Sequence, residues 1–446
     1  MSIEDQIEGL DLEVGEAAFK LPRPSKALTA LTTSALALPG IAGSARAEGP
    51  IERATGAYAF SWYKEDNLSP SRFSGAGSRE RYEVLTHQLR FDLPVAERAD
   101  IGIDFLYEEM SGASPWFVEV DPDDPADGRL QVMSGATIED ERIDLTADID
   151  FYMDEGKDNL SAGFSRERDY LSVHAGLGTE RNYNEKNTTL SGSFAFAYDW
   201  IEPTDADIFI ERPTAGERFS FDLFTGLSQI ISRASTAQIT LNYKHSNGYL
   251  SDPYKAIRGF SASDVLLSDQ RPDTKDQVSI LARYRHHFEA LSGSLHLDYR
   301  FYWDDFGVTS HTAEIGWYQT FFDLVTIAPG FRWYSQSKAD FYDTVLEAGI
   351  TEDDPRNRSS DFRLSPYGAV SWKIKAEVEL VDLFEYRPPS WLEAIGISEG
   401  FDLTASVSYE RYLSDGDLSI VRIQEADEAP GLVRFRLVAF SLSGRF

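Results

Sequence analysis

Apolar and polar residues alternate with a period of two along most of the chain, and this pattern restricts the fold more than any other feature. From Phe446 back to Val438, every second residue is apolar or glycine, while arginine, serine or alanine lies between them. The same alternation runs through 143–151 and 401–409. A period of two is typical of strands with one apolar face and one polar face. The sequence therefore predicts an all-β protein.

Sixteen segments show the pattern: 54–63, 82–93, 99–108, 141–151, 158–166, 170–178, 186–198, 219–228, 237–246, 276–287, 292–301, 308–318, 323–335, 361–373, 400–411 and 434–446. A soluble sandwich would also alternate, so the connections decide between the two folds. Short connections occur at 94–98, 152–157, 179–185, 229–236, 288–291 and 319–322, and long ones at 64–81, 109–140, 199–218, 247–275, 336–360 and 412–433. Short periplasmic turns that alternate with long outer loops are typical of a transmembrane barrel.

Three connections depart from this alternation. Two expected outer loops are short, 167–169 and 302–307, and one expected inner turn is long, 374–399. The long turn indicates either a periplasmic insertion or an error of two in the number of strands. We therefore predict a transmembrane antiparallel up-and-down β-barrel of about 16 strands, with a range of 14 to 18.

The composition narrows the function. The chain has 446 residues, no cysteine and a net charge of -32. Nucleic-acid binding is not expected, because phosphate contacts need a basic surface. The absence of cysteine excludes a disulfide framework, a thiolate metal site and a cysteine nucleophile. No uncharged apolar run reaches the roughly 18 residues of a membrane helix, which a barrel does not need.

The N-terminal region predicts export. Lys20, Arg23 and Lys26 precede an apolar stretch at 27–42, and Ala45-Arg46-Ala47 follows. A positive flank, a short apolar region and an A-x-A site indicate a secretory signal peptide that is cleaved after Ala47. Residues 1–47 are thus expected to be an extension plus signal peptide, and 48–446 the barrel. The sequence does not decide whether residues 1–25 are translated.

The last strand ends on an aromatic residue. Phe440, Leu442 and Phe446 share its apolar face. The strand resembles the closing strand of bacterial outer-membrane barrels, where such an ending implies insertion into the outer-membrane lipid by the barrel-assembly machinery. The expected location is the outer membrane of a Gram-negative bacterium.

Four stretches resemble one bacterial family in order: 111–115 (SGASP), 186–190 (KNTTL), 246–255 (SNGYLSDPYK) and 299–312 (YRFYWDDFGVTSHT), with 339–342 (ADFY) further on. They are similar to the family catalogued as domain of unknown function 3570, and the resemblance covers most of the chain after the signal peptide. It implies an outer-membrane barrel without an assigned activity or catalytic residues. It also implies an envelope redox or flavin-linked setting, in which the barrel itself carries no redox group.

No enzyme or cofactor is expected from the motifs. Serine-hydrolase, nucleotide-binding and zinc motifs are absent, and the seven histidines are scattered. Ser310 and His311 are adjacent, so they point to opposite faces of a strand and cannot form a catalytic pair directly. A weak Ca²⁺ candidate is formed by Asp121, Asp123, Asp124 and Asp127, although a solvated acidic loop is the favoured interpretation, because the spacing of an EF-hand is lacking.

The charged residues expected inside the barrel indicate a function more clearly than these motifs do. If the more apolar side of each strand faces lipid, strands two to four direct a predicted acidic wall inward: Asp92, Asp104, Glu108, Asp144, Asp148 and Asp150, with Arg90. Strands 9 to 14 direct a predicted basic wall inward: Lys244, Arg283, Arg285, His287, His296, Arg300, Arg332 and Lys373, with Asp298 and Glu314. The third and eleventh of sixteen strands lie across the lumen from one another, so the two walls would face each other.

Two functions remain open at this stage. The first is a pore for small polar solutes, because a transverse field in the lumen orients charged and dipolar molecules. The alternative is a closed barrel that anchors or displays an unknown envelope protein. Aromatic residues in two long outer loops favour the alternative: Trp116, Phe117, Tyr249, Tyr254 and Phe260.

Overall fold

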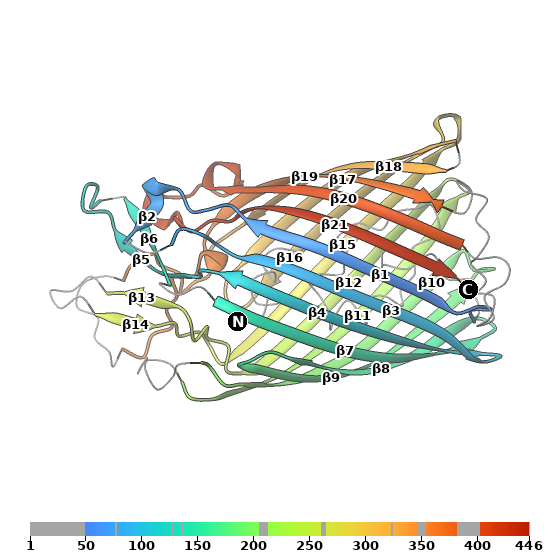
Figure 1. Cartoon of the computed structure of the whole chain (residues 1–446), viewed down its shortest axis with the longest axis horizontal. Coiled ribbons are helices and arrows are strands. Elements are labelled where there is room, and N and C mark those ends of the chain that lie inside the picture. The colour runs from blue at the N-terminus through green and yellow to red at the C-terminus, as the bar shows by residue number, and fades with distance from the viewer. Residues whose placement is uncertain are drawn as a thin grey trace.

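The chain forms a closed antiparallel barrel, which Figure 1 shows from the side. The computed structural model describes residues 50–445, apart from 76–77, 127, 135–137, 205–212, 260–264, 323, 347–353 and 381–401. Within these residues the barrel has sixteen strands. They are β1 (Thr55–Glu65), β3 (Glu83–Ala96), β4 (Ala99–Gly112), β7 (Ile138–Met153), β8 (Gly156–Arg166), β9 (Tyr170–Tyr183), β10 (Thr188–Ile201), β11 (Gly216–Ser232), β12 (Ser235–Gly248), β15 (Thr274–Phe288), β16 (Gly293–Asp304), β17 (Thr309–Phe321), β18 (Val325–Gln336), β19 (Tyr367–Glu379), β20 (Asp402–Asp415) and β21 (Arg434–Arg445). The predicted fold class and strand number are confirmed.

Closure of the barrel depends on its first and last strands. β21 pairs with β1 in a register that runs from Thr55↔Arg445 to Glu65↔Phe435, and with β20 on its other side. Closure leaves no strand edge unpaired, which is what a sheet in lipid requires. The predicted signal peptide, 1–47, lies outside the described residues.

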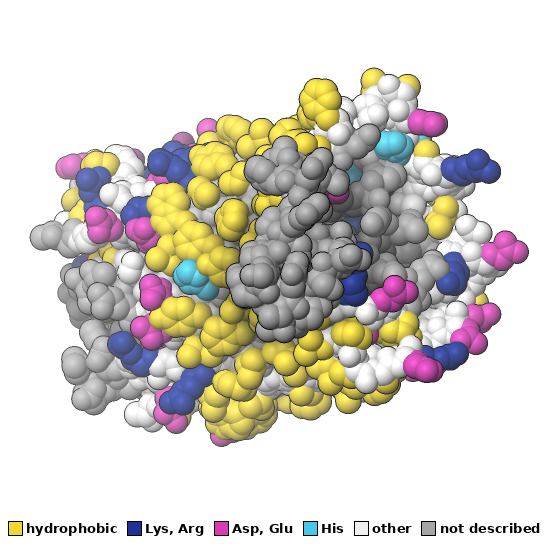
Figure 2. All heavy atoms as spheres, turned by 45° about the vertical axis from the view of Figure 1, so that its right-hand side comes forward, with side chains coloured by type: hydrophobic (Ala, Val, Ile, Leu, Met, Phe, Trp, Pro, Cys, Tyr) yellow, Lys and Arg dark blue, Asp and Glu magenta, His cyan; other side chains and the backbone are white. Residues whose placement is uncertain are grey.

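The two faces of each strand differ as the alternation predicts. On β4, Ile103 and Phe105 are exposed on the outside, while Asp104 and Glu108 are buried on the inside. Figure 2 shows apolar side chains over the barrel wall, with charged side chains gathered towards its two ends. An apolar outer band between charged ends matches the hydrocarbon core of a membrane. Among the described residues, no helix has the length and apolarity to cross a membrane.

The two ends of the barrel also differ. The C-terminus lies at the end with short turns, on the right of Figure 1. At the other end, the loops form small sheets of their own: β2 (Phe73–Ser74), β5 (Pro115–Val120) and β6 (Arg129–Met133) make one, and β13 (Ala256–Arg258) and β14 (Leu266–Ser268) make another. These strands are too short to show a periodicity in sequence, and they were not predicted.

The strand predicted at 361–373 is displaced in the structure. β19 begins at Tyr367, directly after Pro366, and continues to Glu379. Proline has no N–H for the strand ladder, which explains why the strand begins after it. Residues 374–379 therefore belong to the strand and not to the predicted insertion. The rest of the insertion, 381–399, lies outside the described residues.

Outer loops pack into the barrel mouth on an apolar cluster. Its members come from strands β1, β3, β4 and β18–β21 and from the loops at 305–308, 337–342, 359–366 and 429–433. Tyr82, Tyr342 and Phe435 are each at most 2% exposed. The barrel therefore has its main apolar core at the outer mouth, in contact with a lumen whose inward-facing side chains are largely polar.

Candidate functional site: a charged lumen beneath a packed outer mouth

The predicted acidic wall is gathered on the inner face of β3, β4 and β7. Arg90 lies at its centre, with Nη2 2.7 Å from Asp92 Oδ1 and 3.2 Å from Asp148 Oδ1. The Arg90 guanidinium also donates to Asp104. A Cβ at Gly102 would lie 2.5 Å from both Arg90 Nη2 and Asp148 Oδ1. Glycine at this position therefore makes room for the ion pair.

The remaining acidic residues have cations that sequence reasoning did not assign. Arg142 lies 3.6 Å from Glu108 and 3.9 Å from Asp144. Lys157 Nζ lies 2.9 Å from Asp150 Oδ2. Carboxylates still outnumber cations among the described residues of this wall, and Asp100, which also faces inward there, adds to the excess.

The predicted basic wall lies on the inner face of β12 and β15–β19. Arg283 Nε lies 3.8 Å from Asp298, and Arg285 Nη2 lies 2.9 Å from the same carboxylate. Glu314 is shared by Arg332 at 3.3 Å and Lys373 at 3.4 Å. Four further members of the wall occupy inward positions of their strands: Lys244, His287, His296 and Arg300. The His287 ring lies 3.1 Å from Ser294 Oγ, and His296 stacks on Tyr318.

The two walls are arranged to face each other across the lumen. β4 and β16 are separated by eight places in the closed order of sixteen strands. The ion pairs described above join residues of the same wall, so each wall keeps its own sign of excess charge. Opposite excess charge on the two walls directs a field across the interior, and the surroundings of a protein interior screen such a field less than bulk water does.

Above the lumen, buried charges connect three outer loops; we call Asp252, Lys255, Asp269, Arg271, Asp361 and Arg363 the mouth network. Arg363 donates to Asp361 Oδ2 at 2.8 Å and to Asp252 Oδ2 at 2.7 Å. Arg271 lies 2.8 Å from Asp269 and 2.9 Å from Asp361. Lys255 Nζ lies 3.4 Å from Ser114 Oγ and also donates to the Pro115 carbonyl. The network thus joins the loops that follow β4, β12 and β18.

Burial and pairing shift the ionisation of the mouth network. Burial alone would raise the pKa of Asp361, but Arg363, Lys255 and Arg271 outweigh it and hold that pKa well below 3.8. Burial lowers the pKa of Lys255 to about 8, although Asp361 and Asp252 oppose the change. Removing one member of such a group leaves a buried charge uncompensated. The mouth network therefore holds the three loops together, and the loss of any one member should weaken the contacts between them.

The other predicted residues lie apart from the lumen. Phe440 and Leu442 face outward on β21, and Phe446 lies outside the described residues. Asp121, Asp123 and Asp124 form an exposed turn in which Asp123 N donates to Asp121 Oδ1 at 2.9 Å, and Asp127 is not described. Trp116 and Phe117 of β5 meet edge to face with ring centroids 5.0 Å apart, Tyr249 and Tyr254 are half-buried, and Phe260 is not described.

Two serine–histidine pairs, one adjacent in sequence and one close in space, can be compared with a hydrolytic site. Ser310 faces inward. His311 faces outward, where its Nδ1 lies 2.8 Å from the Tyr299 hydroxyl. Ser235 Oγ lies 2.7 Å from His286 Nδ1 on the outer face, near the end with short turns. Among the described residues, no carboxylate or amide bonds to His286, and a hydrolytic triad needs such a partner. That the protein is not an enzyme therefore stays a prediction.

Comparisons with known proteins identify the family. A family model described as "Protein of unknown function (DUF3570)" matches residues 28–387, which is most of the chain. The chain belongs to this family. A search of curated proteins finds no match. The DUF3570 protein is thus assigned to the family that its sequence motifs resemble.

Several solved structures are similar to this DUF3570 protein at low sequence identity. A bacterial polysaccharide outer membrane secretin has a TM-score of 0.44 at 6% identity and covers 88% of this chain and 98% of its own. OccD3 (OpdP) of Pseudomonas aeruginosa has a TM-score of 0.42 at 9% identity, with 96% and 100% covered. CdiB from Acinetobacter baumannii has a TM-score of 0.46 at 8% identity, with 89% and 60% covered. None of these similarities identifies a solute or partner for this chain.

The closed barrel and its apolar outer face determine where the protein resides. Sixteen antiparallel strands with lipid-facing and lumen-facing residues in alternation are the architecture of bacterial outer-membrane proteins. This DUF3570 protein is an integral barrel of the Gram-negative outer membrane. Sequence reasoning missed the mouth network because its residues are far apart in the chain and come together only when the loops fold inward.

Proposed function

We propose that this protein is a channel for small polar solutes whose lumen is divided into an acidic side and a basic side. The observation that carries the proposal is the inward grouping of Asp92, Asp104 and Asp148 opposite Arg283 and Arg285. A scaffold that only filled its interior would do so at lower cost with apolar side chains, because each buried ion pair needs desolvation.

The mouth network restricts the outer entrance of the proposed channel. The loops after β4, β12 and β18 are fastened together over the apolar cluster, so they narrow the outer opening. A narrowed mouth above a charged lumen favours small solutes that carry charge or a strong dipole. We expect molecules with both signs of charge to be oriented by the two walls as they pass.

Ion selectivity tests the channel. The protein is extracted from outer membranes in detergent, inserted into a planar bilayer, and the reversal potential is measured in a salt gradient. Joint neutralisation by Arg283→Gln, Arg285→Gln and Arg300→Gln should shift selectivity towards cations, because the acidic wall then dominates. Arg434→Gln is the matched control, since that side chain lies outside the lumen and is half-exposed. Equal reversal potentials for the triple variant and the control would contradict the proposal.

A closed scaffold is the second candidate, and the packed outer mouth favours it. In that case the loops would hold an envelope protein rather than admit a solute, and the half-buried Tyr249 and the Trp116–Phe117 pair would be available for contacts. Deletion of 250–270 should then abolish recovery of a cross-linked partner from intact cells while the barrel still assembles. A barrel from which no partner is recovered before the deletion would count against the scaffold.

A further inference from the structure

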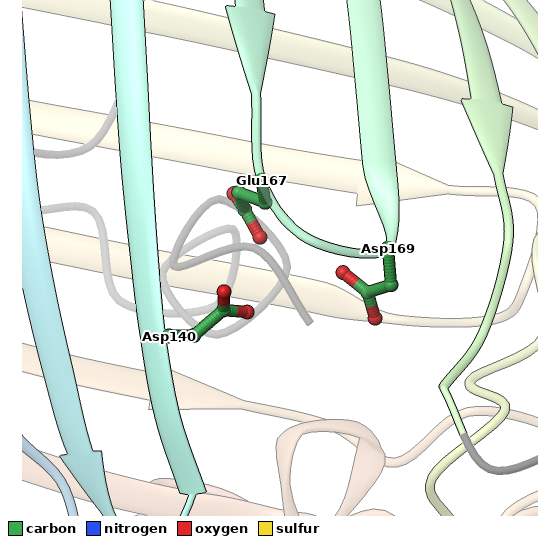
Figure 3. A group of neighbouring side chains, drawn as sticks. All are labelled: Asp140, Glu167 and Asp169. Carbon is green, nitrogen blue, oxygen red and sulfur yellow. The ribbon is translucent and has the colours of Figure 1, made fainter.

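Three carboxylates converge at the outer rim, beyond the outer end of the acidic wall. Asp140 lies in the outer part of β7, and Glu167 and Asp169 lie in the turn between β8 and β9. One oxygen of each lies within 4.8 Å of the other two, and Figure 3 shows the three side chains turned towards a common space. The strand pairing explains the meeting: Ile143 pairs with Arg166, the last residue of β8, so the outer part of β7 that holds Asp140 runs beside the turn at 167–169.

Glu167 points to a ligand in this space. Its side chain is 8% exposed, and neither carboxylate oxygen accepts a hydrogen bond from any residue that the structure describes. An ionised acceptor buried without donors is unfavourable by roughly 1–3 kcal/mol or more. A bound cation would remove that penalty.

The neighbouring polar groups have partners of their own. Arg142 directs its Nε to Ser165 Oγ at 3.0 Å and its guanidinium to Glu108 and Asp144. Asp169 accepts a hydrogen bond from the Tyr254 hydroxyl, and Thr204 N donates to that hydroxyl oxygen at 3.0 Å. Tyr254 therefore fixes the orientation of Asp169 and connects the carboxylates to the loop after β12.

We propose that Asp140, Glu167 and Asp169 bind a hard divalent cation, and that Ca²⁺ fits best. All three ligands are carboxylate oxygens, whereas protein Zn²⁺ sites normally include nitrogen or sulfur ligands. Oxygens on opposite sides of Ca²⁺ are about 4.6–5.2 Å apart, compared with about 4.0–4.2 Å for Mg²⁺. Separations of up to 4.8 Å between the three oxygens are compatible with Ca²⁺.

Such an ion would stiffen the outer mouth. It would join β7 to the turn between β8 and β9 and, through Tyr254, to the loop that carries Lys255 of the mouth network. The exposed Asp121–Asp124 turn, which the sequence suggested for Ca²⁺, offers no buried acceptor of this kind.

Terbium luminescence tests the site directly. The protein is extracted from outer membranes in detergent, treated with chelator and titrated with Tb³⁺, a luminescent substitute for Ca²⁺. Tyr254 touches Asp169, so excitation of its ring should sensitise the bound ion. We expect saturable emission that Ca²⁺ displaces and that Mg²⁺ displaces at least tenfold less effectively. Glu167→Gln and Asp140→Asn should each weaken Tb³⁺ binding at least tenfold.

Asp123→Asn is the matched control, because it removes one carboxylate from the exposed acidic turn. It should bind Tb³⁺ like the wild type, and heat-modifiable mobility on gels shows that each variant is folded. The inference is overturned if the folded wild type shows no saturable emission, or if both rim variants bind like the wild type. It is also overturned if Asp123→Asn, rather than the rim variants, loses the signal.

Discussion

At the scale of single residues, the mouth network concentrates more buried charge than any other group of outer-loop residues described above. Arg363 is 7% exposed in its side chain and pairs both with Asp361 of its own loop and with Asp252, which lies 111 positions earlier in the chain. Removal of the Arg363 guanidinium would leave the buried charge of Asp252 without this partner, and Asp361 with fewer cations beside it. Exposed ion pairs such as Arg434–Asp415 lack this dependence, because water replaces the lost partner.

We therefore expect Arg363→Met to loosen the outer mouth without unfolding the barrel. The local free energy of opening should fall by about 3 kcal/mol, since one partner of a buried ion pair is lost. Hydrogen exchange of peptides covering 265–272 and 357–366 measures this change. Arg434→Met should alter exchange by less than about 1 kcal/mol. Equal exchange in the two variants would show that the network does not fasten the loops.

The pH dependence of the mouth follows from the Asp361 carboxyl. Its pKa is lowered in the folded state, so its contribution to stability is present above about pH 4 and is lost as the pH falls through the folded pKa. Asp269 acts in the opposite sense, because burial raises its pKa. The acid-dependent increase in loop exchange below about pH 4 should therefore shrink in Asp361→Asn. An unchanged acid dependence in that variant would assign the effect to another group.

At the scale of elements, most of the barrel follows from the alternation alone. The segment predicted at 141–151 became β7, and its inward aspartates were identified because a period of two assigns every residue to a face. The boundary at 361 was wrong because residues 361–364 are apolar and charged in a strand-like order, yet they form a short buried 3₁₀ turn. Nothing local distinguishes such a turn from a strand.

The loop contacts could not be predicted in the same way. Asp252 and Arg363 meet only because two long loops fold over the same mouth, and no periodicity connects them. The grouping of the rim carboxylates, Asp140, Glu167 and Asp169, could in principle have been predicted from the sequence. Pairing 141–151 with 158–166 places Asp140 beside the turn that carries Glu167 and Asp169, although that pairing had to be known first.

The closing strand makes a testable prediction at this scale. Phe440 faces lipid on β21, while Ser443 faces the lumen three residues later. Phe440→Asp should lower the amount of assembled barrel, because a charged side chain on the lipid face is unfavourable by up to about 2–4 kcal/mol near the midplane. Ser443→Asp should assemble normally. The folded fraction in outer membranes, read from heat-modifiable mobility, measures both, and comparable loss in both variants would contradict the assigned faces.

At the scale of the whole molecule, the barrel combines two features that oppose each other. The inner wall keeps acidic and basic charge on opposite sides, which suits the passage of polar solutes. The outer mouth is packed with aromatic side chains and fastened by buried ion pairs, which restricts entry. A channel with a narrowed, fastened mouth reconciles them, and it predicts that loosening the mouth increases conductance.

Single-channel conductance in a planar bilayer tests that account most directly. Wild-type protein extracted from outer membranes should give discrete steps with a preference among ions that depends on salt concentration, because screening weakens the field of the two walls. Arg363→Met should give larger or longer openings in the same bilayers. A folded barrel that remains silent in both forms would contradict the channel and leave the closed scaffold as the better description.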